Sequence, residues 1–330
     1  MVDRERRAAV PGRREFLQGL SAAAAAGIGL RASARAGEGK AGENRASSGE
    51  KKAAPAGPMP TIQLGPRRIS RLVCGWNPIG GHSHSTPDMS KSMREWFTVD
   101  RTVDLLTGCL SHGINAWQYD HTETAVQTLQ KLREKTDEMK LICLHAARTV
   151  DAPIQKVIDE TRPFAMVHHG GVTDSKFRAG RFGEVRDFVK QVKDHGLLAG
   201  VSTHCPDNLK RVADEGWEND FFMACFYYVT RPADEMQQKL GKVPVGEPFF
   251  ESDPAEMAAA IRQVAKPCLG FKILAAGRVC WQKATTERAF RFAFENIKPI
   301  DGVIVGMFPR YTDQVAENSS YARKHGALRS

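Results

Sequence analysis

The sequence predicts an α/β fold, a (β/α)8 TIM barrel with an N-terminal β-hairpin cap. From residue 61 onward, short apolar segments that suit strands covered on both faces alternate with amphipathic segments of helical period. Eight such pairs can be counted. No Gly-x-Gly-x-x-Gly follows the first strand, which favours a closed barrel over an open doubly wound sheet.

The barrel is expected to occupy residues 61–330. A hairpin that turns at Gly65-Pro66 runs into the first core strand, Arg71–Gly75. The later strands are expected at residues 114–119, 141–144, 165–167, 198–202, 221–226, 269–274 and 302–305. The helices are expected at residues 99–112, 125–137, 154–161, 183–195, 208–215, 253–265, 286–296 and 313–325.

Apolar spacing and end signals support these helices. Residues 99–112 place Val99 and Val103 on one apolar stripe and end before Gly113. A proline in the first turn opens residues 253–265, a position where the missing N–H is not needed.

The first 60 residues have a different character. Residues 12–18, Gly-Arg-Arg-Glu-Phe-Leu-Gln, resemble the twin-arginine export motif and precede an alanine- and glycine-rich stretch and an Ala-x-Ala sequence. We therefore expect residues 1–36 to be a twin-arginine signal peptide and residues 37–60 to be a disordered linker. An alanine-rich surface helix is the alternative. If residues 1–36 are a signal peptide, the twin-arginine export machinery is an expected partner of the chain. The mature protein is then expected in the periplasm without a stable membrane anchor.

Net charge does not indicate nucleic-acid binding. Residues 1–60 hold 11 lysines and arginines against 6 acidic residues, and so carry +5 of the formal +9. The rest of the chain is close to neutral for its size and has no basic run interleaved with aromatics. Seven cysteines are scattered without a Cys-x-x-Cys pair, so we predict no disulfide framework.

Histidines gather at the predicted mouth of the barrel. Five of the ten fall at or just after the ends of strands two to five, and two more lie in the loop after strand one. Because a barrel brings these strand ends together, we expect a functional cluster rather than incidental hydrogen bonds. The seven are His82, His84, His121, His145, His168, His169 and His204. The other three precede glycines at helix ends and suit caps: His112, His195 and His325.

Acid–base chemistry and metal binding both suit such a cluster. In the acid–base interpretation, His168, His145 and Asp120 are catalytic. In the metal interpretation, His145, His168 and His204 bind a divalent ion such as zinc, with Asp120 or His121 completing the shell. The strand before His168 is too apolar for the surface, so this imidazole is expected to point into the mouth or to be buried and hydrogen-bonded.

Lys272 stands inside a predicted apolar strand. A lysine there must reach the mouth, form an ion pair or change its pKa. A phosphate contact, a Schiff base and an ion pair across the barrel all stay open.

Several segments resemble the aldo/keto reductases, in chain order, over nearly all of residues 61–326. Residues 113–117, Gly-Ile-Asn-Ala-Trp, are similar to the family's Gly-Ile-Asn-Phe-Phe strand. Residues 200–203, Gly-Val-Ser-Thr, resemble its Gly-Val-Ser-Asn, and residues 271–274, Phe-Lys-Ile-Leu, resemble its Met-Lys-Pro-Leu. Residues 305–318 resemble the closing segment that clasps the adenosine phosphate.

The resemblance implies an NADP-dependent oxidoreductase for a small carbonyl or sugar substrate. It places these residues at the cofactor: Ser202, Lys272, Gly306, Arg310, Gln314 and Asn318. The family's catalytic aspartate falls on Gln118, its tyrosine near Glu123 and its lysine near His145, while His168 matches its active-site histidine. The active site would thus be rebuilt around histidine, and NADP would have to leave the cytoplasm tightly bound.

Three interpretations stay open. The first is an exported oxidoreductase with a retained dinucleotide, which the chain-long resemblance favours. The second is a metal-dependent hydrolase, lyase or isomerase with a histidine-rich site at the mouth, which the altered catalytic positions favour. The third is a non-catalytic binding protein, against which the clustered titratable residues argue mildly.

Overall fold

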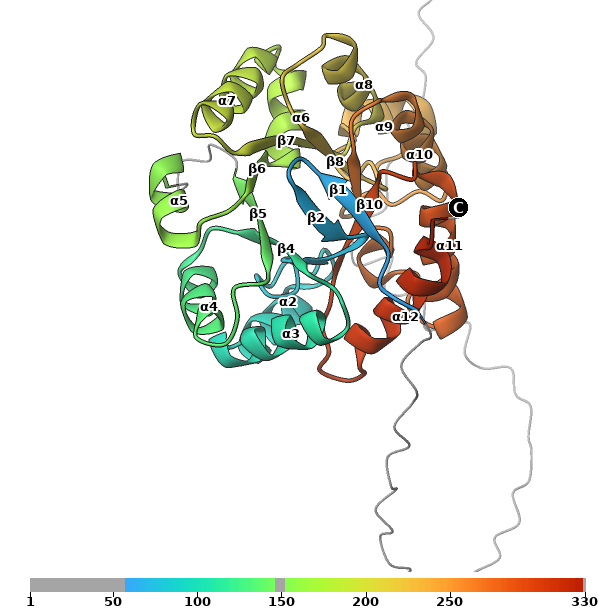
Figure 1. Cartoon of the computed structure of the whole chain (residues 1–330). Helices are drawn as coiled ribbons and strands as arrows, with labels where there is room; N and C mark the ends of the chain where they lie inside the picture. Colours follow the sequence, from blue (N-terminus) through green and yellow to red (C-terminus); the bar gives the residue numbers. More distant parts are fainter. Residues whose placement is uncertain (1–56, 146–151, 329–330) are drawn as a thin grey trace, which may run out of the picture. The chain divides into compact units, whose positions relative to one another are not determined.

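A computed structural model describes residues 57–145 and 152–328 (Figure 1). The predicted signal peptide and nearly all of the predicted linker lie outside the described residues. Within the described part, eight parallel strands close into a barrel in the order β10-β3-β4-β5-β6-β7-β8-β9, which confirms the predicted fold class. The strands are β3 (Leu72–Gly75), β4 (Ala116–Asp120), β5 (Lys140–His145), β6 (Ala165–His168), β7 (Leu198–Thr203), β8 (Phe221–Cys225), β9 (Cys268–Phe271) and β10 (Gly302–Gly306).

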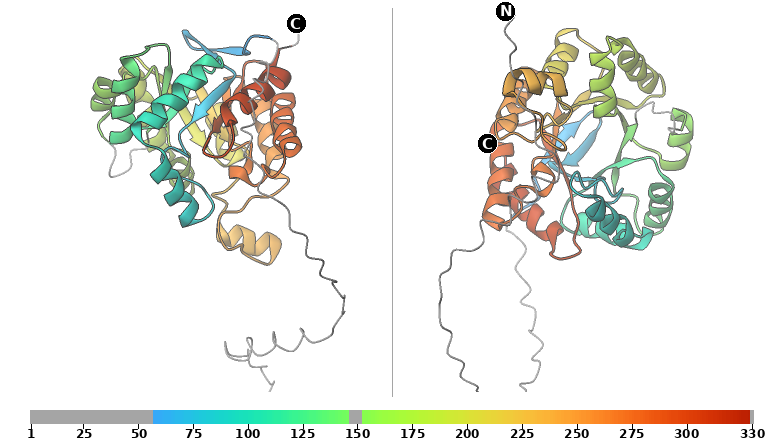
Figure 2. Two further views of the ribbon diagram at one scale, coloured as in Figure 1. Left: turned by 90° about the horizontal axis from the view of Figure 1, so that it is seen from below. Right: turned by 180° about the vertical axis from the view of Figure 1, so that it is seen from behind.

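Helices surround the barrel on its outer side (Figures 1 and 2). They are α2 (Pro87–Trp96), α3 (Val99–Ser111), α4 (Glu123–Arg133), α5 (Ile154–Thr161), α6 (Gly170–Arg178), α7 (Phe182–Asp194), α8 (Pro206–Asp214), α9 (Ala233–Leu240), α10 (Asp253–Gln263), α11 (Lys283–Asn296) and α12 (Gln314–Gly326), with a 3-10 turn at Ala275–Gly277. The sequence analysis did not predict α2, α6 and α9.

A hairpin closes the amino end of the barrel, as expected. Strand β1 (Thr61–Leu64) pairs with β2 (Arg67–Ser70), and Gly65 takes φ 55° at the first central position of the two-residue turn. Leu64 and Ile69 are fully buried among the inward-facing residues of the barrel strands. Figure 1 shows the hairpin lying across the centre of the barrel, and Figure 2 shows α9 at the opposite end.

Side chains on the strands alternate between the inside of the barrel and the layer under the helices. On β6, Ala165 and Val167 belong to the inner cluster together with the hairpin, whereas Met166 packs with the helices. On β5, Ile142 packs inside and Cys143 packs outside. This alternation decides which polar side chains at the strand ends reach the mouth.

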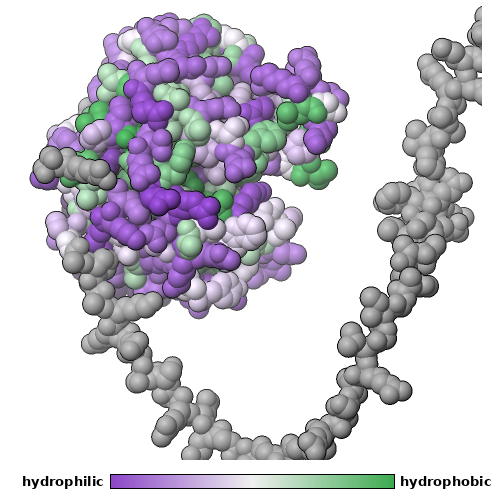
Figure 3. All heavy atoms as spheres, turned by 90° about the vertical axis from the view of Figure 1, so that its right-hand side faces the viewer, coloured by the Kyte–Doolittle hydropathy of each residue, from purple (hydrophilic) through white to green (hydrophobic). Residues whose placement is uncertain are grey.

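The outer surface seen in Figure 3 is mainly hydrophilic, with smaller hydrophobic patches. Among the described residues, no helix combines the length and the apolar character that crossing a membrane requires.

Candidate functional site

A cavity of about 940 Å³ opens at the carboxyl ends of the strands, the end at which TIM barrels hold their active sites. We call it the mouth cavity. Residues of seven strands line it, most of them at or next to the carboxyl end of their strand: Gly75, Asp120, Leu144, Ser202, Met223, Phe271 and Gly306. Loops after the strands and the first turns of α12 supply much of the remaining wall.

An aspartate–histidine pair faces this cavity. His204, just after β7, lines the wall, and its Nδ1 lies 2.9 Å from Oδ2 of Asp174 on α6. The Asp174 carboxylate is almost fully buried and also accepts hydrogen bonds from the His204 backbone N–H at 3.0 Å and from Asn208 and Thr230 at 3.0 and 2.8 Å. The hydroxyl of Thr203 donates a fifth hydrogen bond.

The surroundings of this pair favour a neutral imidazole beside an ionised carboxylate. Burial lowers the pKa of His204, and the charges of Lys272 and His84 lower it further, while Asp174 acts in the opposite direction. Burial alone would raise the pKa of Asp174, but hydrogen bonds from His204, Thr203 and Thr230 and the charge of His204 outweigh it and lower the pKa.

A second histidine–carboxylate pair crosses the mouth. Nδ1 of His84 lies 2.9 Å from both carboxylate oxygens of Glu247, and its Nε2 lies 3.1 Å from the amide of Asn77. Arg278 donates to the His84 carbonyl at 2.9 Å. Burial would raise the pKa of Glu247, but His84, Lys272 and the more distant His204 outweigh it and lower the pKa.

The cavity has polar groups deeper in the barrel. Gln118 and Asp120 point inward from β4, and each is more than nine-tenths buried. Within the described residues, Nε2 of Gln118 is buried and has no hydrogen-bond partner. Because an unpartnered buried amide is costly, this group is suited to donate to a bound ligand.

Backbone conformation also singles out this cavity. Five non-glycine residues in the described chain have positive φ, and three of them line the mouth cavity: His84 at 53°, Lys272 at 57° and Ala276 at 52°. Such conformations cost energy and gather at functional sites. The same geometry ends β9 at Phe271, so Lys272 follows the strand instead of lying within it as predicted.

Five of the six predicted cofactor residues line the mouth cavity: Ser202, Lys272, Gly306, Gln314 and Asn318. Arg310 instead donates to the hydroxyl of Ser92 on α2 at 2.8 Å. Arg278 and Lys283, which the sequence analysis did not select, add positive charge to the same wall as Lys272. A wall with three cations and several amide and hydroxyl groups fits the phosphates and ribose of a dinucleotide.

The structure contradicts the placement of His168 and His145 at the mouth. His168 on β6 and His145 on β5 lie opposite each other in register, and both point outward from the barrel, toward the helices. Both contact the ring of Phe188 on α7. His168 is fully buried with Nδ1 2.7 Å from the hydroxyl of Thr173, so the expectation of a buried, bonded imidazole is the one that holds. Nε2 of His145 lies 2.7 Å from the carbonyl oxygen of Ala152.

The predicted metal set does not come together either. His121 bonds Glu160 at 2.6 Å, His204 bonds Asp174, and His145 and His168 lie outside the barrel wall. Over residues 57–145 and 152–328, no group of three or more histidine, cysteine or acidic side chains is arranged to hold a metal ion. Of the predicted catalytic residues, Asp120 alone lines the mouth cavity.

Sequence reasoning missed Asp174 and Glu247. Asp174 lies on α6, which the sequence analysis did not predict; Gly170 and Gly171 open this helix with ordinary φ values, and His169 is its N-cap. Histidine is not among the preferred N-cap residues, so the start of this helix carried no recognised signal. Glu247 lies in a segment without regular structure, where spacing carries no signal.

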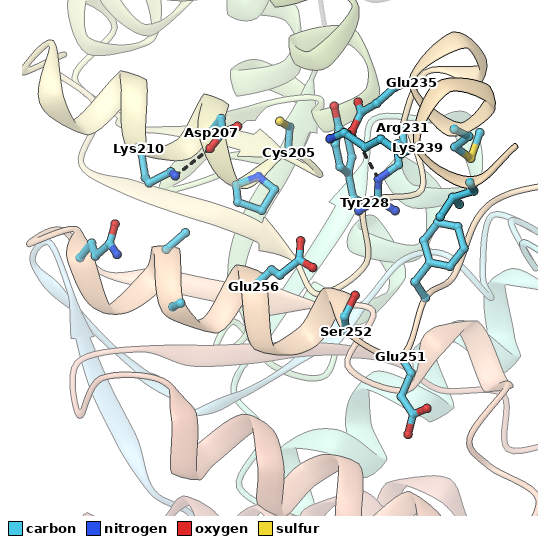
Figure 4. A pocket seen from close by; sticks show the side chains of 17 residues that line it. Cys205, Asp207, Lys210, Tyr228, Arg231, Glu235, Lys239, Glu251, Ser252 and Glu256 are labelled. Atoms are coloured by element: carbon cyan, nitrogen blue, oxygen red, sulfur yellow. Dashed lines mark hydrogen bonds and ion pairs between the residues drawn. The ribbon is translucent and has the colours of Figure 1, made fainter.

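A second cavity of about 620 Å³ lies between α8, α9 and α10 (Figure 4). Several of its charged side chains pair with one another: Lys210 lies 2.7 Å from Asp207, and Glu235 lies 2.9 Å from Lys239 and 3.9 Å from Arg231. Cys205 faces this second cavity, whereas its neighbour His204 faces the mouth cavity.

No protein-family profile and no curated protein matches the sequence. Among solved structures, a protein assigned as an aldo-keto reductase from Pseudomonas aeruginosa aligns with 17% identity and a TM-score of 0.54, covering 81% of this chain and 94% of that one. The glycerol dehydrogenase from Gluconobacter oxydans gives 12% identity and a TM-score of 0.49, with 82% of this chain and 90% of that one covered. Dihydropteroate synthase from Xanthomonas albilineans aligns with 11% identity and a TM-score of 0.45, and the alignment covers 82% of this chain and 100% of that one. At these identities the likeness shows the barrel fold alone.

Proposed function

We propose that the protein is an NADP(H)-dependent oxidoreductase that acts on a small carbonyl or sugar substrate in the mouth cavity. The observation that carries this proposal is the continuity of one cavity. It joins a cationic wall, made by Lys272, Arg278 and Lys283, to buried polar groups at Gln118 and Asp120. The cationic wall suits an anionic cofactor, and the buried polar groups suit a hydroxylated or carbonyl substrate.

The chain's own residues bind and orient in this proposal. The cationic wall holds the cofactor phosphates, and Gln314 and Asn318 at the start of α12 offer amides to the adenosine end. Ser202 and Gly306 lie at strand ends, where close approach to a planar ring requires small side chains. NADP(H) supplies the hydride chemistry when it is bound.

The metal-dependent alternative loses its support because its four histidines do not converge on one point, and each has a partner of its own. Elemental analysis of the purified protein checks this directly. A stoichiometric transition metal would favour that alternative over our proposal.

Calorimetric titration with NADPH tests the proposed function. We expect saturable binding well below millimolar cofactor. Lys272→Met should weaken it by about 10–100-fold, since a charge-assisted hydrogen bond contributes about 1.5–3 kcal/mol. Lys131→Met is the matched control, because Lys131 pairs with Asp100 away from the cavity. No detectable binding at millimolar NADPH by a folded protein would contradict the proposal.

We further propose that this enzyme acts in the periplasm after export as a folded protein. The twin-arginine-like sequence at residues 12–18 supports this, and export in the folded state would carry a bound dinucleotide along.

A further inference from the structure

We propose that His204, held by Asp174, exchanges a proton with the substrate oxygen in the mouth cavity. The inference rests on the proposed function and assigns the acid–base group for a hydroxyl-bearing substrate. His204 would then take the place of a tyrosine, because neither Tyr227 nor Tyr228 lines this cavity, and Tyr311, which does line it, is largely exposed to solvent.

The hydrogen bonds of the pair define which ring nitrogen reacts. Nδ1 of His204 donates to Asp174, which cannot donate in return when ionised. Nε2 therefore carries the lone pair, and within the described residues it has no hydrogen-bond partner. The ring also packs edge-on against Phe271 at 5.5 Å, which limits its rotation.

Asp174 is built to fix this arrangement. Its carboxylate accepts five hydrogen bonds, from Thr203, Asn208, Thr230 and two from His204, so it can neither turn nor easily take up a proton. A buried carboxylate that orients an imidazole in one tautomer is an established way to prepare a general base.

Burial favours the neutral form of His204, and the positive charges of Lys272 after β9 and His84 in the loop after β3 add to it, whereas Asp174 on α6 favours the protonated form. Glu247, between α9 and α10, is the other charged group near this ring. Since burial and the neighbouring cations lower the pKa of His204, the unprotonated ring predominates. That form can accept a proton, which is the role of the base in oxidation of an alcohol.

The proposed step moves one proton and one hydride. Nε2 of His204 accepts the proton of a substrate hydroxyl, and the carbon that bears the oxygen loses a hydride to NADP⁺, which gives a carbonyl and NADPH. In the reverse direction the imidazolium returns its proton to the oxygen that forms. Solvent reprotonates or deprotonates the ring between turnovers.

The test uses the full mature protein with NADP⁺ and a panel of polyols from glycerol to sorbitol, followed by formation of reduced nicotinamide. We expect His204→Ala to lower kcat by about 10²–10⁴-fold with little change in NADPH affinity. Added imidazole should restore part of the lost rate. In the wild type, kcat/KM for oxidation should fall as pH drops through the lowered pKa of His204, because the protonated ring cannot accept a proton.

His325→Ala is the matched control, since His325 also bonds a glutamate, Glu287 at 3.0 Å, but lies on α12 away from the cavity wall. It should keep the rate and show no response to imidazole. His204→Gln provides a second variant of similar size, whose melting temperature shows whether the loss follows unfolding.

The outcomes separate the two proposals. If NADPH binds but His204→Ala keeps wild-type turnover, or if loss of activity is matched by loss of folded protein in both variants, the inference is wrong and the proposed function stands. Failure of the wild type to oxidise any polyol while NADPH binds also overturns the inference. Failure of NADPH to bind overturns both.

Discussion

Phe188 on α7 packs against two imidazoles in the layer between the barrel and its helices. Its ring centroid lies 5.8 Å from that of His145 in a stacked arrangement and 5.1 Å from that of His168 in an edge arrangement. The hydroxyl of Thr173 bonds His168 at 2.7 Å. These contacts give His168 a structural role beneath α6 and α7.

We expect His168→Ala to destabilise the protein by about 2–4 kcal/mol, because it removes a buried hydrogen bond and leaves a cavity. NADPH affinity should be unchanged. Chemical denaturation measures the first and calorimetry the second. His195→Ala, which alters an exposed helix cap, is the control and should cost less than about 1 kcal/mol. Unchanged stability with lost cofactor binding would return His168 to the active site.

The histidine cluster was only partly predictable because the sequence does not show whether a strand side chain points into the barrel or out toward the helices. Parallel strands are apolar on both faces, so the sequence of β6 does not reveal which of Met166 and Val167 faces inward. A one-residue difference in that choice moves His168 from the mouth to the helix layer. Residues beyond a strand end, such as His204 and Lys272, escape this uncertainty because the loop sets their direction.

At the scale of elements, strands and long amphipathic helices followed from periodicity, whereas short helices did not. Helices α2, α6 and α9 span 10, 9 and 8 residues, and α2 buries no residue fully. Helices α2 and α9 bury at most one residue each, and only one of the four residues that α6 buries, Phe177, is a large apolar one, so little apolar period can be detected. Helix α6 nevertheless matters most for the site, since it carries Asp174.

The hairpin is the element whose contribution can be measured most simply. Leu64 is fully buried where β1 closes the barrel, in contact with the same inner cluster as Ile69 and Val73. We expect Leu64→Ala to lower the free energy of unfolding by about 2–5 kcal/mol in urea denaturation. Val245→Ala, at a fully exposed position, should change it by less than about 0.5 kcal/mol. Equal values for the two variants would mean that the hairpin does not support the barrel.

At the scale of the whole molecule, no disulfide bond contributes to the described barrel. All seven cysteines are free, and six of them are buried. The strands close into a barrel without a free edge, as the sequence predicted. A chain of this kind can complete its fold without forming a disulfide bond.

We propose that export of this folded chain depends on residues 12–18, which resemble a twin-arginine motif. Replacing Arg13 and Arg14 together by lysine keeps the charge but removes the paired guanidinium groups, which lysine does not reproduce. We expect the double variant to stay in the cytoplasm at its full length, whereas the wild type should reach the periplasm shortened near residue 36. Fractionation with intact-mass measurement checks both. The same exchange at Arg6 and Arg7 is the control and should leave export intact. Normal periplasmic recovery of the Arg13/Arg14 variant would contradict the export proposal. NADPH bound to wild-type protein purified from the periplasm would support export of the folded protein with its cofactor.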